Sequence, residues 1–92
     1  MNRRLTAYVT EEDIALGSRF SSTGCPIALA LKRVYPNLRI SLDGITLAVW
    51  APYLGQSYYT VNAEARSFID RFDKGETVRP AGFDFWKRGA NE

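Results

Sequence analysis

The sequence predicts an α+β domain: a single small antiparallel sheet with a central three-stranded meander, packed with two main helices and one short N-terminal helix. Residues 38–50 alternate apolar and polar side chains on both sides of Asp43-Gly44, which indicates a β-hairpin. Residues 26–35 and 63–74 instead carry apolar side chains at the spacing of amphipathic helices. A composition with 46% apolar and 24% charged residues is typical of a globular chain, and 92 residues fit one domain, 1–92. We expect its ends, 1–4 and 88–92, to be flexible.

The first elements along the chain are a strand and a short helix. Residues 5–9 alternate and include β-branched and aromatic side chains, which predicts a strand. Thr10 and Asp13 have the spacing of a capping box, in which the Thr10 hydroxyl accepts a hydrogen bond from the Asp13 amide. A helix should therefore begin at about Glu11, and Gly17 should end it after little more than one turn.

The second helix is the best specified. Cys25-Pro26 marks its start, because proline suits the first helical position, where its missing amide would be unpaired in any case. Pro36 ends it. One apolar stripe should face the core: Ile27, Ala30, Leu31 and Val34.

The hairpin should be closed by a two-residue Asp43-Gly44 turn, which places Leu42 opposite Ile45. This register puts Arg39 and Trp50 together on one face. The other face then carries six aliphatic side chains: Leu38, Ile40, Leu42, Ile45, Leu47 and Val49.

The remaining elements are a strand, a helix and a last strand. Residues 57–61 form a tyrosine-rich third strand that extends the meander. Asn62 can cap a third helix, which Lys74-Gly75 ends. Its buried stripe is expected to be Ala65, Phe68, Ile69 and Phe72. Residues 83–86 alternate and should form a final strand at a sheet edge.

The sequence contains no recognisable catalytic or metal-binding pattern. Histidine is absent, which removes the side chain most often used as a general base near neutral pH. No glycine-rich phosphate loop, Cys/His metal spacing or Gly-x-Ser-x-Gly turn occurs. Cys25 could be a reactive thiol at a helix start, but a small buried structural residue is the favoured interpretation. We therefore expect no enzyme activity, no cofactor and no metal.

Charge and cysteine content limit which partners and which cellular compartment are expected. Twelve basic and 10 acidic residues leave a net charge of +2, too little to indicate nucleic acid without clustering. Arg3, Arg4, Lys87 and Arg88 would cluster if the first and last strands pair, although solvated termini are the simpler interpretation. A lone cysteine suits a reducing compartment, and no apolar run approaches the ~20 residues of a membrane span. We expect a soluble cytoplasmic protein that does not contact membranes.

The candidate binding surface is the hairpin face that carries Arg39 and Trp50. Tyr53, Tyr58 and Tyr59 follow closely in the sequence. Tryptophan, tyrosine and arginine are enriched at binding hot spots, so we expect these five residues to contact a partner. The alternative is that the third helix or the loop at 18–24 covers this face, which would make Trp50 a core residue.

Four segments together resemble a group of small proteins from tailed phages and some bacteria. They are residues 9–14 (Val-Thr-Glu-Glu-Asp-Ile), 25–31 (Cys-Pro-Ile-Ala-Leu-Ala-Leu), 63–65 (Ala-Glu-Ala) and 68–75 (Phe-Ile-x-x-Phe-Asp-Lys-Gly), ahead of Val78, Pro80 and Phe83. The resemblance implies a phage-type accessory protein and transfers no catalytic residue. Ala81-Gly82 departs from the group, which continues from Pro80 directly into aromatic residues; this leaves the start of the last strand open.

Together these features favour stoichiometric binding over catalysis. We expect a phage-type protein that occupies a host macromolecule, most readily a host protein such as a defence or transcription component, in the cytoplasm of the host cell. The alternative is a nucleic-acid or nucleotide-binding module that stacks bases on its aromatic residues and meets phosphates with its arginines. A homo-oligomer is compatible with either function.

Overall fold

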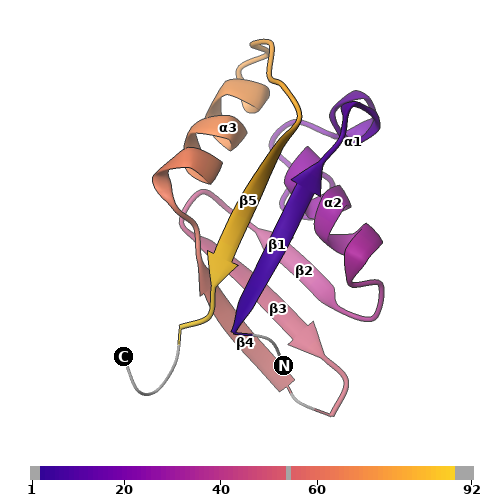
Figure 1. Cartoon of the computed structure of the whole chain (residues 1–92), viewed down its shortest axis with the longest axis vertical. Helices are drawn as coiled ribbons and strands as arrows, with labels where there is room; N and C mark the ends of the chain where they lie inside the picture. Colours follow the sequence, from indigo (N-terminus) through magenta and orange to yellow (C-terminus); the bar gives the residue numbers. More distant parts are fainter. Residues whose placement is uncertain (1–2, 54, 89–92) are drawn as a thin grey trace.

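The structure is a computed structural model that describes residues 3–53 and 55–88. Its elements follow the order β1 (Arg4–Val9), α1 (Glu11–Leu16), α2 (Pro26–Val34), β2 (Arg39–Leu42), β3 (Thr46–Ala51), β4 (Gly55–Thr60), α3 (Ala63–Asp73) and β5 (Ala81–Trp86) (Figure 1). The α+β class is confirmed, with three helices and an antiparallel β2-β3-β4 meander. The last strand begins at Ala81, so the departure from the phage-protein pattern lies inside β5.

The strands form two ladders where one sheet was expected. β1 pairs with β5 along its whole length, from Arg4 opposite Trp86 to Val9 opposite Ala81. The two ladders meet at one end, where Lys87 bridges to Tyr59 of β4 and the Arg88 amide donates to the Tyr58 carbonyl at 2.8 Å. Beyond this point β5 diverges from β4, because α3 lies beside it (Figure 1).

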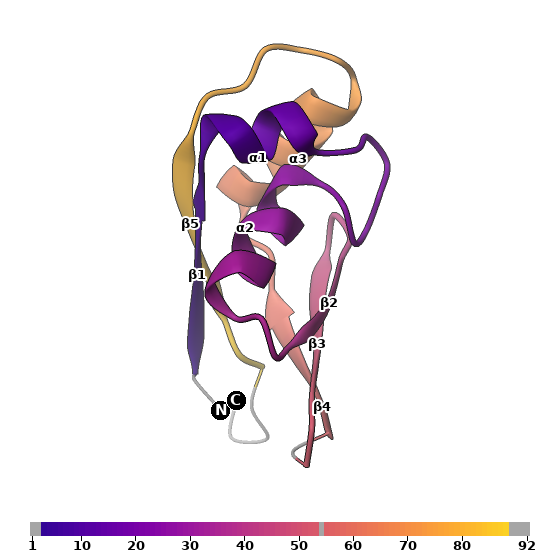
Figure 2. The same ribbon diagram turned by 90° about the vertical axis from the view of Figure 1, so that its right-hand side faces the viewer.

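The helices lie between the two ladders (Figure 2). α2 contacts both β1 and β2, and it therefore fills the space between the first strand and the outer strand of the meander. The inward faces of both ladders and of α2 and α3 form one core. The largest fully buried side chains are those of Tyr59, Phe85, Leu5, Ile27, Leu31, Leu47 and Val49.

Local sequence signals fix the ends of the helices. The Asp13 amide donates to the Thr10 hydroxyl at 3.2 Å and the Asp13 carboxylate accepts from the Thr10 amide at 2.9 Å, which completes the predicted capping box. The Asn62 side chain accepts from the Ala65 amide at 2.9 Å and caps α3. Gly75 follows α3 with φ of 83°, a left-handed conformation that favours glycine.

The predicted hairpin register is wrong by two residues. Leu42 pairs with Leu47 instead of Ile45, because the Asp43 carboxylate accepts from the amides of Ile45 and Thr46, each at 2.7 Å. These bonds place Gly44 and Ile45 at the tip of the turn. A shift of two preserves the two faces, since side chains alternate with period two. Ile45 nevertheless leaves the predicted aliphatic face and is exposed.

Arg4, at the end of the N-terminal segment expected to be flexible, begins β1. The ladder extends one residue further, because the Lys87 amide donates to the Arg3 carbonyl at 2.7 Å. Residues 1–2 and 89–92, the rest of the expected flexible ends, lie outside the described residues.

Candidate functional site

No helix or loop among the described residues covers the outer face of the meander, the face that carries Trp50 and Tyr58. Arg39 lies opposite Trp50, and Trp50 lies opposite Gln56 on β4, so these three side chains form a row on one face. The next row brings Tyr58 opposite Ala48, diagonal to Trp50. Trp50 is 44% exposed and Tyr58 47% exposed. Neither residue is in the core, so the alternative in which a helix or loop covers Trp50 does not apply.

Arg39 and Trp50 interact directly. The Arg39 guanidinium carbon lies 5.3 Å from the centroid of the Trp50 ring, which is within the range of a cation–π contact. A shallow depression of about 140 Å³ lies beside this pair, and Ser41 and Gln56 contribute to its walls. Arg39 and Trp50 therefore share a face as the sequence predicted, although the register that the sequence predicted is wrong.

The three tyrosines of the predicted site do not stay together. Tyr58 lies on the outer face, and Tyr53 is fully exposed in the β3–β4 turn with a left-handed φ of 70°. Tyr59 faces inward and is fully buried, and this burial raises the pKa of its phenol. Tyr59 is thus a core residue and leaves the candidate site.

The outer face continues from β4 onto the end of β5. The Arg88 amide bonds to the Tyr58 carbonyl, and the Thr60 hydroxyl donates to the Trp86 carbonyl at 3.3 Å. Across β1, the Arg4 guanidinium carbon lies 5.6 Å from the centroid of the half-exposed Trp86 ring. We call the resulting set of exposed side chains the aromatic–arginine belt: Arg39, Trp50, Tyr58, Arg88, Trp86 and Arg4.

Sequence reasoning missed Trp86 as a site residue. It treated Arg3, Arg4, Lys87 and Arg88 as a separate and weaker candidate, whereas β1–β5 pairing joins that cluster to the belt. A signal was present, because Trp86 alternates with the buried Phe83 and Phe85 and so had to point outward.

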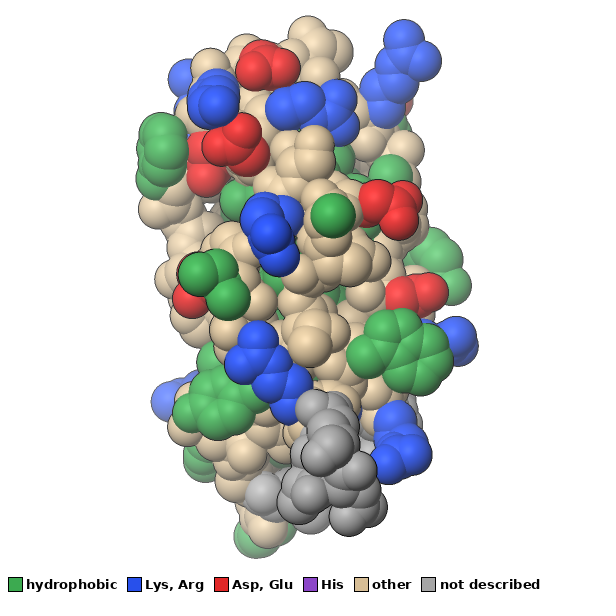
Figure 3. Space-filling view, turned by 90° about the vertical axis from the view of Figure 1, so that its left-hand side faces the viewer, with side chains coloured by type: hydrophobic (Ala, Val, Ile, Leu, Met, Phe, Trp, Pro, Cys, Tyr) green, Lys and Arg blue, Asp and Glu red, His purple; other side chains and the backbone are tan. Residues whose placement is uncertain are grey.

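Charge is segregated along the molecule. The described acidic residues lie in α1, in α3 and the residues that follow it, in the β2–β3 turn, and at Asp84 in β5, whose carboxylate accepts from the Thr6 hydroxyl at 2.7 Å. The strand end that carries the belt adds Arg3 and Lys87 to the belt arginines. In Figure 3 the acidic side chains lie in the upper half and middle of the face, and the lower half shows basic and large hydrophobic side chains.

Cys25 is a core residue that caps α2 without a side-chain hydrogen bond. Burial raises the pKa of its thiol, which disfavours the reactive thiolate. Among residues 3–53 and 55–88, no group of three or more His, Cys, Asp or Glu side chains could hold a metal ion. Within the same part of the chain, no helix has the length and hydrophobicity needed to cross a membrane.

Comparisons with protein-family models, with curated proteins and with solved structures find no match to this chain.

Proposed function

We propose that this protein acts by stoichiometric binding of a macromolecule, and that the aromatic–arginine belt holds single-stranded nucleic acid. The observation that carries the proposal is the combination of exposed aromatic rings and guanidinium groups towards one end of the molecule, away from most of the described carboxylates. Net charge alone did not favour this partner, because 10 acidic residues nearly offset the 12 basic ones.

The belt offers both interactions that sequence-independent binding of a single strand requires. Trp50, Tyr58 and Trp86 present rings on which bases can stack, each stack contributing about 1–3 kcal/mol. The guanidinium groups of Arg39 and Arg4 lie beside two of these rings, Arg88 follows β5 next to Tyr58, and all three can meet the phosphates. The two cation–π contacts restrain their arginines before a ligand arrives, which lowers the entropy lost on binding.

A host protein is the second candidate. The Arg39–Trp50 pair consists of residue types that dominate protein-binding hot spots, and an acidic protein surface would complement the same belt. The resemblance to small phage proteins supports this candidate, with a defence or transcription component in the host cytoplasm as the partner.

The decisive experiment measures binding of fluorescein-labelled oligothymidine to the full chain by fluorescence anisotropy. We expect the logarithm of the association constant to fall with the logarithm of salt concentration by about 0.7 per phosphate contact. Trp50→Ala should weaken binding about tenfold or more without lowering the melting temperature. Arg39→Gln should reduce the salt dependence.

Matched controls separate the belt from general effects of charge or aromatic content. Tyr8→Ala removes an exposed ring outside the belt, and Arg71→Gln removes an exposed charge on α3. Both variants should bind oligothymidine as the parent does. Absence of binding at low salt, or equal losses in Trp50→Ala and Tyr8→Ala, would contradict the proposal. If the parent captures a host protein and Trp50→Ala does not, the second candidate replaces the first.

A further inference from the structure

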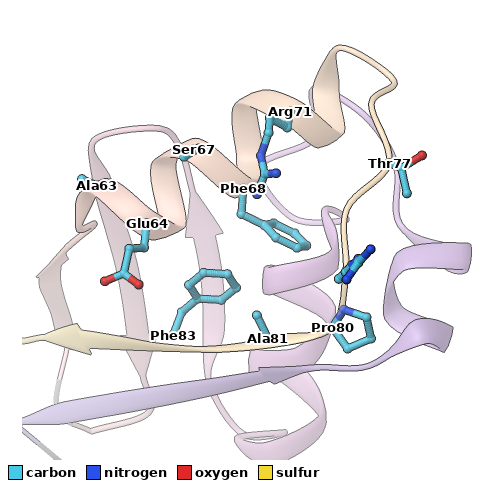
Figure 4. Close-up of a pocket in the computed structure, with 10 residues that line it drawn as sticks. Ala63, Glu64, Ser67, Phe68, Arg71, Thr77, Pro80, Ala81 and Phe83 are labelled. Atoms are coloured by element: carbon cyan, nitrogen blue, oxygen red, sulfur yellow. The ribbon is translucent and has the colours of Figure 1, made fainter.

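A second surface lies at the other end of the molecule, between α3 and the start of β5. It is a groove of about 530 Å³, a volume within the range of ligand pockets (Figure 4). α3 presents Glu64, Ser67 and Arg71 to it at helical spacing, and Arg79 approaches from the segment before β5. None of these residues belongs to the aromatic–arginine belt.

Two aromatic side chains form the floor of the groove. The rings of Phe68 from α3 and Phe83 from β5 point toward one another, with centroids 5.2 Å apart and an interplanar angle of 63° (Figure 4). Both side chains are largely buried in the core, so the floor is apolar and fixed in position. The polar side chains stand around it.

One wall of the groove is the edge of β5. The Lys87 amide donates to the Arg3 carbonyl, which makes Arg3 and Lys87 a hydrogen-bonded pair. Bonded and non-bonded pairs alternate in an antiparallel ladder, so the backbone amide and carbonyl groups of Gly82 and Asp84 point away from β1. The backbone amide and carbonyl groups of their register partners on β1 likewise point away from β5.

Those partners are Tyr8 and Thr6, and one outward backbone group of each is hydrogen-bonded to a side chain of α2 or of the residue after it. The Tyr8 carbonyl accepts from Arg33 at 2.7 Å, and the Thr6 amide donates to the Tyr35 hydroxyl at 3.4 Å. On the β5 side, the outward groups of Gly82 and Asp84 have no hydrogen-bond partner among the described residues. The upper part of β5 therefore has an open strand edge, and its residues Ala81 and Phe83 line the groove.

The charges of the groove are complementary to a carboxylate. Arg71 and Arg79 line the same cavity, are exposed, and form no ion pair with any residue in 3–53 or 55–88. Glu64 lies on α3 two turns before Arg71, nearer the N-terminus of the helix. A guanidinium pair recognises a carboxylate by charge-assisted hydrogen bonds.

We propose that this groove binds an extended peptide segment of a partner protein that adds as a strand to the edge of β5. The peptide backbone pairs with the open groups of Gly82 and Asp84, alternate apolar side chains rest on Phe68 and Phe83, and a carboxylate of the peptide binds Arg71 and Arg79. The backbone pairing supplies affinity, and the arginines supply the preference for a carboxylate.

The test is a selection of short random peptides, displayed with either a free or a blocked C-terminus, on the immobilised full chain. We expect enrichment of peptides with alternating apolar residues and one carboxylate. Enrichment in the free-end library alone would assign the carboxylate to the chain terminus, and enrichment in both would assign it to Asp or Glu. Binding should shift the backbone amide resonances of Gly82 and Asp84.

Position 82 provides a matched pair of variants. A Cβ atom at Gly82 would lie 3.6 and 3.7 Å from atoms of the Tyr8 ring, an ordinary contact, so alanine fits there. Only Gly82→Pro removes the amide that points away from β1, and proline is tolerated in a strand where the amide does not take part in the ladder. Gly82→Pro should weaken peptide binding at least about tenfold, and Gly82→Ala should leave it nearly unchanged. Replacing Arg71 and Arg79 together by glutamine should abolish the preference for a carboxylate.

Three outcomes would overturn the proposal. They are a selection that enriches no peptide, equal peptide binding by Gly82→Pro and Gly82→Ala, and a dimer of the parent chain that Gly82→Pro dissociates, which would mean that the edge pairs with a second copy. Trp50→Ala should not affect peptide binding, and Gly82→Pro should not affect oligothymidine binding. The two surfaces can therefore fail independently.

Discussion

Arg33 of α2 is hydrogen-bonded to the carboxylate of Asp13 in α1, one of two buried polar residues among those described. The same guanidinium donates to the Tyr8 carbonyl on β1 at 2.7 Å, and the carboxylate also completes the Thr10 capping box. One ion pair thus joins β1, α1 and α2.

Asp13→Asn should lower the free energy of unfolding by about 1.5–3 kcal/mol, because hydrogen bonds to a charged group contribute about that much and the neutral amide cannot replace the carboxylate. Glu12→Gln is the matched control, since Glu12 is the exposed neighbour in the same turn. Urea denaturation of both variants checks the prediction. Equal stabilities would show that the Asp13–Arg33 pair contributes little.

Acid should destabilise the protein through two carboxylates. Burial alone would raise the pKa of Asp13, but the hydrogen bonds from Arg33 and Thr10 outweigh it and hold that pKa below its ordinary value of 3.8. The amides of Thr46 and Ile45 likewise lower the pKa of Asp43. A folded-state pKa below the unfolded value gives stability that is complete above pH ~4 and is lost as the pH falls further. Urea midpoints measured from pH 6 down to pH 2 should fall below pH ~4, and less steeply in Asp13→Asn.

The β2–β3 turn should depend on Asp43 and not on Gly44. The φ of Gly44 lies outside the left-handed region, and no atom lies within 4 Å of a Cβ built there. Gly44→Ala should therefore stay within about 0.5 kcal/mol of the parent or gain stability. Asp43→Ala should cost about 1 kcal/mol or more, because the amides of Ile45 and Thr46 lose their acceptor.

Thermal unfolding of the two turn variants measures this difference. Asp43→Asn is the control, because its side chain keeps an acceptor oxygen. A large loss of stability in Gly44→Ala would instead support the two-residue Asp43-Gly44 turn that the sequence alone favours.

Two adjacent tyrosines of β4 should respond oppositely to truncation. Tyr59→Ala should destabilise the fold by about 3–5 kcal/mol, as expected for a large ring removed from the core. Tyr58→Ala should leave stability nearly unchanged and weaken oligothymidine binding. Denaturation and anisotropy titration of the two variants provide the measurement. Comparable stability losses at both positions would contradict the outward placement of Tyr58.

Helix ends that depend on residues close together in the chain could be predicted from the sequence. Thr10 and Asp13, Asn62, and Gly75 each fix a helix end through bonds or dihedral angles of their own segment, and all three ends are where the sequence places them. The register between β2 and β3 was harder to predict from the sequence. The Asp43-Gly44 pair favours a two-residue turn formed by these two residues. The Asp43 carboxylate instead stabilises a turn with Gly44 and Ile45 at its tip, because it accepts hydrogen bonds from the amides of Ile45 and Thr46.

The sequence could predict only those parts of the candidate site that depend on the alternation of side chains along a strand and on pairing between strands that are neighbours in sequence. Arg39 and Trp50 share a face in either register, whereas Tyr58 and Tyr59 could be told apart only by knowing which of them lies opposite the buried Leu47. The remainder of the belt needs a contact between the two ends of the described chain. Arg4 joins Trp86 through β1–β5 pairing, and no local pattern specifies that partner.

The pairing of Arg4 with Trp86 also bears on the order in which the parts of the fold form. The meander forms from strands that are neighbours in sequence, so its loops close at little entropic cost. β1 and β5 must instead find each other after the rest of the chain has been gathered, and such non-local pairings are intrinsically slow. We expect the meander and α2 to collapse first and the β1–β5 ladder to close last. The belt therefore comes into existence in two stages: Arg39, Trp50 and Tyr58 assemble early, and Arg4, Trp86 and Arg88 join them only in the final step.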